Sequence, residues 1–250
     1  MKKRSLGVEQ GFSLVEVLLV LLILGVVSGA LLQQVAVVQQ RASTEQLKVD
    51  DFQQARDFVD QFFRDINQAG YPNLRMFDTT TGGTWSPQLS STVINDSRLA
   101  AGLVKIDSNE IRFEGDANGD GNIESMIYKI NGSGTCTLCL QRSQVDKATG
   151  SPLSQSQNWG TEVNDVVNTS ALFTYFKADG TQVTGLPLDI STTSGAQTIA
   201  SVKTIQISLT VRNNNVVDPK TRQPIETSFE GEVSLNNCNM AASGQAMSCN

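Results

Sequence analysis

Side chains that carry oxygen alternate through a short polar segment near the middle of the chain. Carboxylate and amide oxygens are the ligands that hard cations such as Ca²⁺ prefer in proteins. Glycines separate several of these residues, and glycine allows a backbone to turn tightly around an ion. The segment therefore has the residue types of a cation-binding loop, and its candidate ligands are Asp116, Asn118, Asp120, Asn122 and Glu124.

The spacing of these residues matches the first half of an EF-hand loop, with oxygen ligands at positions one, three and five and glycine at position six. Position twelve, where a bidentate glutamate belongs, is Ile127, and no flanking helices are predicted. Two interpretations remain. One is a Ca²⁺ loop between two strands, in which Glu124 or a distant group completes the shell. The other is an acidic turn, because Asn-Gly and Asp-Gly are strong hairpin signals.

A single carboxylate, Glu16, lies near the start of an apolar segment that covers residues 14–32. A bilayer core needs about 20 apolar residues of helix, and this segment is long enough. An ionised carboxylate inside it costs a few kcal/mol or more unless it is paired, so Glu16 is a candidate functional residue. The alternative is that Glu16 lies among the lipid headgroups. Lys2, Lys3 and Arg4 favour a cytoplasmic N-terminus, which places the rest of the chain outside the cytoplasm.

The residues around this carboxylate distinguish between types of N-terminal signal. A secretory signal peptide has a small-residue cleavage site after its apolar stretch, and no A-x-A-like site follows here. Instead, the run Gly11-Phe12-Ser13-Leu14-Val15-Glu16 resembles the class III signal of type IV pilins and of the related type II secretion pseudopilins. The resemblance implies that a prepilin peptidase cleaves between Gly11 and Phe12, that the Phe12 amine is methylated, and that Glu16 forms an assembly salt bridge with a neighbouring subunit.

A second resemblance is weaker and concerns the end of the predicted helix. Residues 64–71, which include Asp65-Ile66-Asn67-Gln68-Ala69-Gly70-Tyr71, resemble a stretch of PilW-type minor pilins. This implies a structural subunit of a type IV pilus, or fimbrium, that assembles with major and minor pilins through inner-membrane machinery. Such a subunit is first a single-pass inner-membrane protein and later part of the pilus at the cell surface. A minor pseudopilin of a type II secretion system is the alternative, and a membrane-tethered, calcium-dependent binding module is an alternative from another class.

The composition restricts the other functions. The formal net charge is -6, so the chain lacks the basic character that nucleic-acid binding normally requires. It contains no histidine, which removes the commonest general base and metal ligand. We therefore expect no enzymatic activity and no nucleic-acid partner, and Ca²⁺ is the one candidate cofactor.

The chain has four cysteines, and all of them lie on the predicted exported side: Cys136, Cys139, Cys238 and Cys249. An oxidising compartment favours disulfides, for which three pairings exist. The end of the chain resembles the disulfide-closed C-terminal region of many pilins, which implies a Cys238–Cys249 bond. A Cys136–Cys139 bond that closes a turn is then favoured over redox or zinc chemistry.

Hydrophobic periodicity predicts an α+β fold, in which one long helix packs on an antiparallel sheet as in pilins. Residues 1–11 form the leader, and residues 12–70 form the helix, with a membrane half followed by an amphipathic half. Residues 73–250 form a β-rich globular domain, in which residues 73–97 are the helix-to-sheet connection and residues 213–224 are a loose hairpin loop. The clear strands are predicted at residues 109–114, 125–130, 172–177, 203–212 and 228–235.

Overall fold

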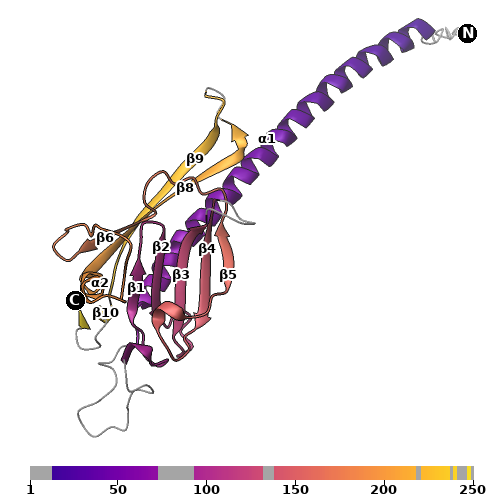
Figure 1. Cartoon of the computed structure of the whole chain (residues 1–250). Helices are drawn as coiled ribbons and strands as arrows, with labels where there is room; N and C mark the ends of the chain where they lie inside the picture. The colour runs from indigo at the N-terminus through magenta and orange to yellow at the C-terminus, as the bar shows by residue number, and fades with distance from the viewer. Residues whose placement is uncertain are drawn as a thin grey trace, which may run out of the picture. The chain divides into compact units, whose positions relative to one another are not determined.

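The structure is a computed structural model of the whole chain (Figure 1). It describes residues 13–72, 93–131, 138–217, 221–236, 239–240 and 247–248. The chain divides into two compact units, Met1–Leu47 and Lys48–Asn250, which are described separately below.

Helix α1 (Leu14–Gln68) begins in the first unit, where its residues up to Leu47 make up the described part of the chain after Ser13. Its span Leu14–Gln39 has a mean hydropathy of 2.7, and none of this span is buried within the protein. By length and composition the span can cross a membrane, and it extends beyond residue 32. The large apolar side chains along it are exposed, for example Leu14 at 76% and Leu32 at 70%. Such a surface needs lipid or other apolar helices around it.

In the second unit, α1 continues to Gln68 because the sequence has neither glycine nor proline between Gly29 and Gly70. Gly70 ends the helix with a left-handed backbone at φ 79°, a conformation that glycine adopts without steric cost. Pro72 follows two residues later and cannot extend the helix.

Most of the described remainder of the second unit belongs to two large antiparallel sheets, and a short two-stranded sheet pairs Asn239–Met240 with Met247–Ser248. The six-stranded sheet has the order β5-β4-β3-β2-β1-β7, and the three-stranded sheet has the order β6-β8-β9. The prediction of an α+β fold, with an N-terminal apolar helix followed by antiparallel sheets, is confirmed. The elements after α1 are η2 (Val93–Asn95), β1 (Gly102–Ile106), β2 (Glu110–Gly115), β3 (Glu124–Asn131), β4 (Cys139–Asp146), η3 (Pro152–Ser154), β5 (Trp159–Val163), β6 (Phe173–Lys177), β7 (Leu188–Asp189), α2 (Thr193–Ala200), β8 (Val202–Val217), β9 (Pro224–Ser234), β10 (Asn239–Met240) and β11 (Met247–Ser248).

The five predicted strands correspond to β2, β3, β6, β8 and β9. The prediction of a loose loop over residues 213–224 is wrong, because β8 extends to Val217 and β9 begins at Pro224. Most side chains in this part of the hairpin are polar, although Asn213 and Val216 are buried, and pairing between the two strands does not need a continuous apolar face. The predicted connection at residues 73–97 falls mostly outside the described residues.

The core of the second unit lies between the C-terminal part of α1 and the two sheets. Figure 1 shows this part of α1 running across one face of the six-stranded sheet. The Phe62 ring lies 5.4 Å from the Tyr128 ring on β3 and 5.2 Å from the Phe173 ring on β6. The ring centroids of Phe52 and of Phe229 on β9 lie 6.3 Å apart. One helical stripe of aromatic residues therefore packs against both sheets.

Candidate functional site

The N-terminal site begins where the described residues begin. Gly11 and Phe12 lie outside the described part of the chain, so their predicted roles stay predictions. The carbonyl of Ser13 accepts hydrogen bonds from the backbone N–H groups of Glu16 at 2.9 Å and Val17 at 3.2 Å. Glu16 therefore lies in the first turn of α1, where a negative charge interacts favourably with the helix dipole.

The side chain of Glu16 is exposed and stands among exposed apolar side chains, including Val15 and Leu19. In an apolar environment this carboxylate needs a positively charged partner, because an unpaired charge there is costly. The first turn of α1 thus presents one acid on an apolar helix surface.

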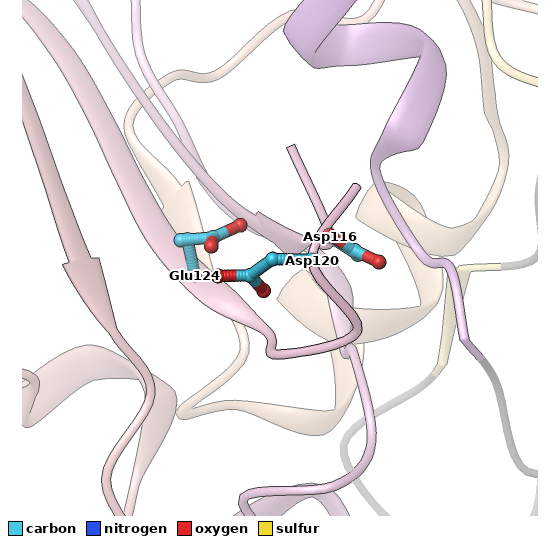
Figure 2. Close-up of side chains that lie close together, drawn as sticks. All are labelled: Asp116, Asp120 and Glu124. Carbon is cyan, nitrogen blue, oxygen red and sulfur yellow. The ribbon is translucent and has the colours of Figure 1, made fainter. Parts of the chain in front are cut away.

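The second candidate site is the loop between β2 and β3. Asp116 and Asp120 come from the loop, and Glu124 is the first residue of β3. One oxygen from each of the three carboxylates lies within 4.8 Å of the others. Figure 2 shows the three side chains close together, Asp116 and Asp120 from the loop and Glu124 from the adjoining strand. The fold brings together three of the five predicted ligands, and these three alone carry negative charge.

Backbone hydrogen bonds hold the loop in this shape. The carboxylate of Asp116 accepts from the N–H groups of Gly119 at 2.7 Å and Gly121 at 3.1 Å. Asp120 accepts from the N–H of Asn122 at 2.7 Å, an interaction that lowers the pKa of the Asp120 carboxyl. Both glycines have a left-handed backbone, with φ of 76° and 90°, which other residues adopt only with strain. The loop conformation is therefore built into the sequence.

Glu124 is the most deeply buried of the three acids, with 1% of its surface exposed against 7% for Asp116, whereas Asp120 is exposed. Its Oε2 accepts a hydrogen bond from the N–H of Ala117 at 2.8 Å, whereas its buried Oε1 has no hydrogen-bond partner. Burial raises the pKa of the Glu124 carboxyl, and the negative charges of Asp120, Asp116 and Asp146 raise it further, against the lowering effect of the Ala117 N–H. The surroundings of Glu124 therefore disfavour the ionised form of its carboxyl group.

The remaining predicted residues lie as follows. Asn118 and Asn122 are exposed in the loop, and the amide of Asn118 donates to Asp120 at 3.1 Å. Ile127 is buried in β3, so it supplies no ligand and strands replace the two helices of an EF-hand. Cys139 is disulfide-bonded. Its partner and the pairing of Cys136, Cys238 and Cys249 lie outside the described residues.

The family model described as the prokaryotic N-terminal methylation motif matches residues 8–32. The match supports a type IV pilin-like or pseudopilin protein. This motif implies processing by prepilin peptidase and, together with the apolar start of α1, membrane anchoring through the N-terminus. No curated protein matches the chain.

Sequence reasoning missed a group of charged residues in the second unit. Hydrophobic periodicity assigns no role to the charged residue Asp65 on α1, yet Asp65 is 0% exposed. Its carboxylate forms an ion pair with Arg142 on β4 and accepts from the Tyr128 hydroxyl. One signal could have found it, because Asp65 follows Phe62 by three positions and precedes Ile66 on the stripe that packs on the sheets.

A second buried ion pair lies close to the loop. Lys147 and Glu114 are both fully buried and are joined at 2.7 Å. The ammonium of Lys147 also donates to the carbonyl oxygens of Ile94 and Leu99 at 2.7 Å each. This ion pair holds the segment before β1, which contains Ile94 and Leu99, against β2. No local sequence pattern indicated the ion pair.

Proposed function

We propose that this chain is a minor pilin, a structural subunit of a type IV pilus that is assembled after prepilin peptidase cleavage and N-methylation. The observation that carries the proposal is the methylation motif at residues 8–32, joined to the apolar helical span Leu14–Gln39, which the described part of the chain leaves unburied. The resemblance of residues 64–71 to PilW-type minor pilins supports the finer assignment.

Cleavage after Gly11 makes the Phe12 amine the new N-terminus, and methylation keeps it cationic. Glu16 is then the fifth residue of the mature chain. In a stagger of parallel helices, the amine of one subunit reaches the Glu16 carboxylate of its neighbour. Each charge is costly alone in an apolar bundle, but the pair is tolerated and fixes the register between subunits.

The pathway starts in the inner membrane. Lys2, Lys3 and Arg4 hold the leader on the cytoplasmic side, so the β-rich unit faces away from the cytoplasm. Inner-membrane assembly machinery then moves the apolar helix from lipid into the bundle of pilin helices. The subunit serves assembly, and it catalyses no reaction.

A minor pseudopilin of a type II secretion system has the same N-terminal requirements. The two functions differ in the filament that contains the subunit. Sheared surface pili that carry the chain support the pilus function, whereas loss of protein secretion without a pilus defect supports the pseudopilin.

The proposal is tested by replacing Glu16 with alanine and following both processing and assembly. We expect mass spectrometry to find a mature, methylated Phe12 N-terminus, while the amount in the sheared filament fraction falls by about tenfold or more, which corresponds to about 1.4 kcal/mol or more of pairing free energy. Val17→Ala is the matched control, because it also shortens a side chain but removes no charge. Normal incorporation of the Glu16→Ala variant would refute the pairing role.

A second variant tests the cleavage site. Gly11→Val puts a branched side chain at the predicted junction, so we expect the full-length precursor to accumulate in the membrane. Mature protein beginning at Phe12 in this variant would contradict the assignment.

A further inference from the structure

We propose that the β2–β3 loop is a Ca²⁺ site, in which Asp116, Asp120 and Glu124 supply the charged ligands. The inference does not rest on the proposed function, since it concerns a different unit of the chain and different residues. It goes beyond a cluster of acidic side chains because one buried member of the cluster has a carboxylate oxygen without a hydrogen-bond partner.

That member is Glu124. Its Oε1 is buried and accepts no hydrogen bond, although a buried acceptor without a partner destabilises the folded state. The carboxylate belongs to the group whose oxygens lie within 4.8 Å of one another, and Figure 2 shows it beside the other two carboxylates. A cation bound between the three carboxylates would give this oxygen its partner.

The charges around the loop favour the same ligand. Asp146 on β4 lies directly opposite Glu124 on β3 in the register of the two strands, so it adds a fourth carboxylate nearby. Among the residues that the structure describes, none of the three loop acids forms an ion pair with lysine or arginine. Lys147 and Arg98 line the hollow beside the loop, but they are ion-paired with Glu114 and Asp96. The negative charge of the loop is therefore left for an external cation.

The chemistry of the ligands selects calcium. Three carboxylates offer up to six oxygens, and the exposed amides of Asn118 and Asn122 and water can add more, which suits the six to eight oxygen ligands of Ca²⁺. Mg²⁺ is smaller, requires a near-ideal octahedron and gives up its water reluctantly. Zn²⁺ prefers nitrogen and sulfur ligands, which this loop does not have.

Occupation of the site would also stabilise the end of α1. The N–H of Asp116 donates to the carbonyl of Tyr71 at 2.9 Å, and the N–H of Gly70 donates to the carbonyl of Glu114 at 2.8 Å. The first residue of the loop is thus bonded directly to the residues that end the helix. A cation that holds Asp116 in place would make this helix-to-sheet junction harder to open.

The experiment uses the mature full-length protein in detergent, stripped of metal with a chelator. Thermal unfolding is followed by circular dichroism with added CaCl₂, with added MgCl₂ or with the chelator alone. We expect Ca²⁺ to raise the melting temperature in a saturable way, because a ligand that binds only the folded state stabilises it. Mg²⁺ should have a much smaller effect at the same concentration. No response to Ca²⁺ would overturn the proposal, and an equal response to Mg²⁺ would overturn the choice of calcium.

Two variants tie the effect to the loop. Asp120→Asn changes an exposed residue, so the protein is expected to fold, and the Ca²⁺ concentration at half-saturation should rise by about tenfold or more, equivalent to about 1.4 kcal/mol. Asp179→Asn is the matched control, because Asp179 is also an exposed aspartate that accepts a turn N–H, from Thr181 at 2.9 Å, but it lies outside the cluster. An unchanged Ca²⁺ response in the Asp120→Asn variant would overturn the proposed site.

Discussion

The guanidinium of Arg142 on β4 lies 2.8 Å from the carboxylate of Asp65 on α1, and this carboxylate is fully buried. The hydroxyl of Tyr128 donates to the same carboxylate oxygen, and Gln61 donates to the other. The aromatic stripe alone would let the helix slide along the sheet, because apolar contacts are non-directional. Directional bonds to one carboxylate fix the position of the helix.

The first prediction concerns this carboxylate. Replacing Asp65 with alanine leaves Arg142 and Tyr128 without their acceptor at a largely buried site. Removing one partner of a buried ion pair is strongly destabilising, and we expect a loss of about 3 kcal/mol in the free energy of unfolding. Urea unfolding of the detergent-solubilised protein, followed by tyrosine and tryptophan fluorescence, measures it.

Asp57→Ala is the control for this variant, since Asp57 is an exposed aspartate on the same helix. It should change the free energy of unfolding by no more than about 0.5 kcal/mol. Equal effects of the two substitutions would show that the Asp65 contacts do not stabilise the fold.

The second prediction concerns Lys147 and the pH. Burial raises the pKa of the Glu114 carboxyl, while the charge and the hydrogen bond of Lys147 lower it. Lys147→Met removes the lowering effect, so the pKa of Glu114 rises further in the folded variant. A raised folded-state pKa gives stability that is present below the unfolded pKa and is lost as the pH rises through the folded value.

The stability deficit of Lys147→Met relative to the unmodified protein should therefore be larger at about pH 8 than at about pH 5, and it should reach about 3–5 kcal/mol at the higher pH. Chemical unfolding at the two pH values measures the difference. In the double variant Glu114→Gln/Lys147→Met the deficit should no longer depend on pH in this way. A deficit that is the same at both pH values in the single variant would contradict the argument.

The third prediction concerns the close approach of β2 to the end of α1. A Cβ at Gly115 would lie 2.2 Å from the carbonyl oxygen of Gln68, so Gly115→Ala forces two backbone segments apart. Overpacking of this kind costs about 1–3 kcal/mol. Gly160→Ala in strand β5 is the matched control, because its nearest contact would lie at 3.9 Å. Melting temperatures of the two variants compare the effects, and a Gly115→Ala protein as stable as the control would show that the junction can adjust.

Several parts of the fold could be predicted because their signals are local. The apolar run and the absence of glycine and proline up to Gly70 predicted the helix, and strict alternation predicted β3 and β8. Strands β1 and β5 lack a clear alternation and were not predicted. The end of β8 was placed too early, because a ladder between polar strands depends on the partner strand rather than on periodicity.

The candidate sites also differ in whether their residues are close together in the sequence. Asp116, Asp120 and Glu124 lie within nine residues of one another, so spacing alone could identify them. Asp65 and Arg142 are separated by 77 positions, and no short-range pattern connects them. Charge type alone gives no reason to expect Asp65 in the core, because acids are seldom buried without a partner.

The sequence alone determined the apolar N-terminal helix, its single carboxylate and the loop of alternating oxygen ligands, because each is written in neighbouring residues. Only the tertiary structure decided which charges are buried and paired, and that Glu124 has an oxygen without a partner. Burial and pairing depend on residues that are distant in the chain and meet only when the sheets close over the helix. For that reason the helix and the loop could be found from spacing, whereas the case for a bound cation required the folded chain.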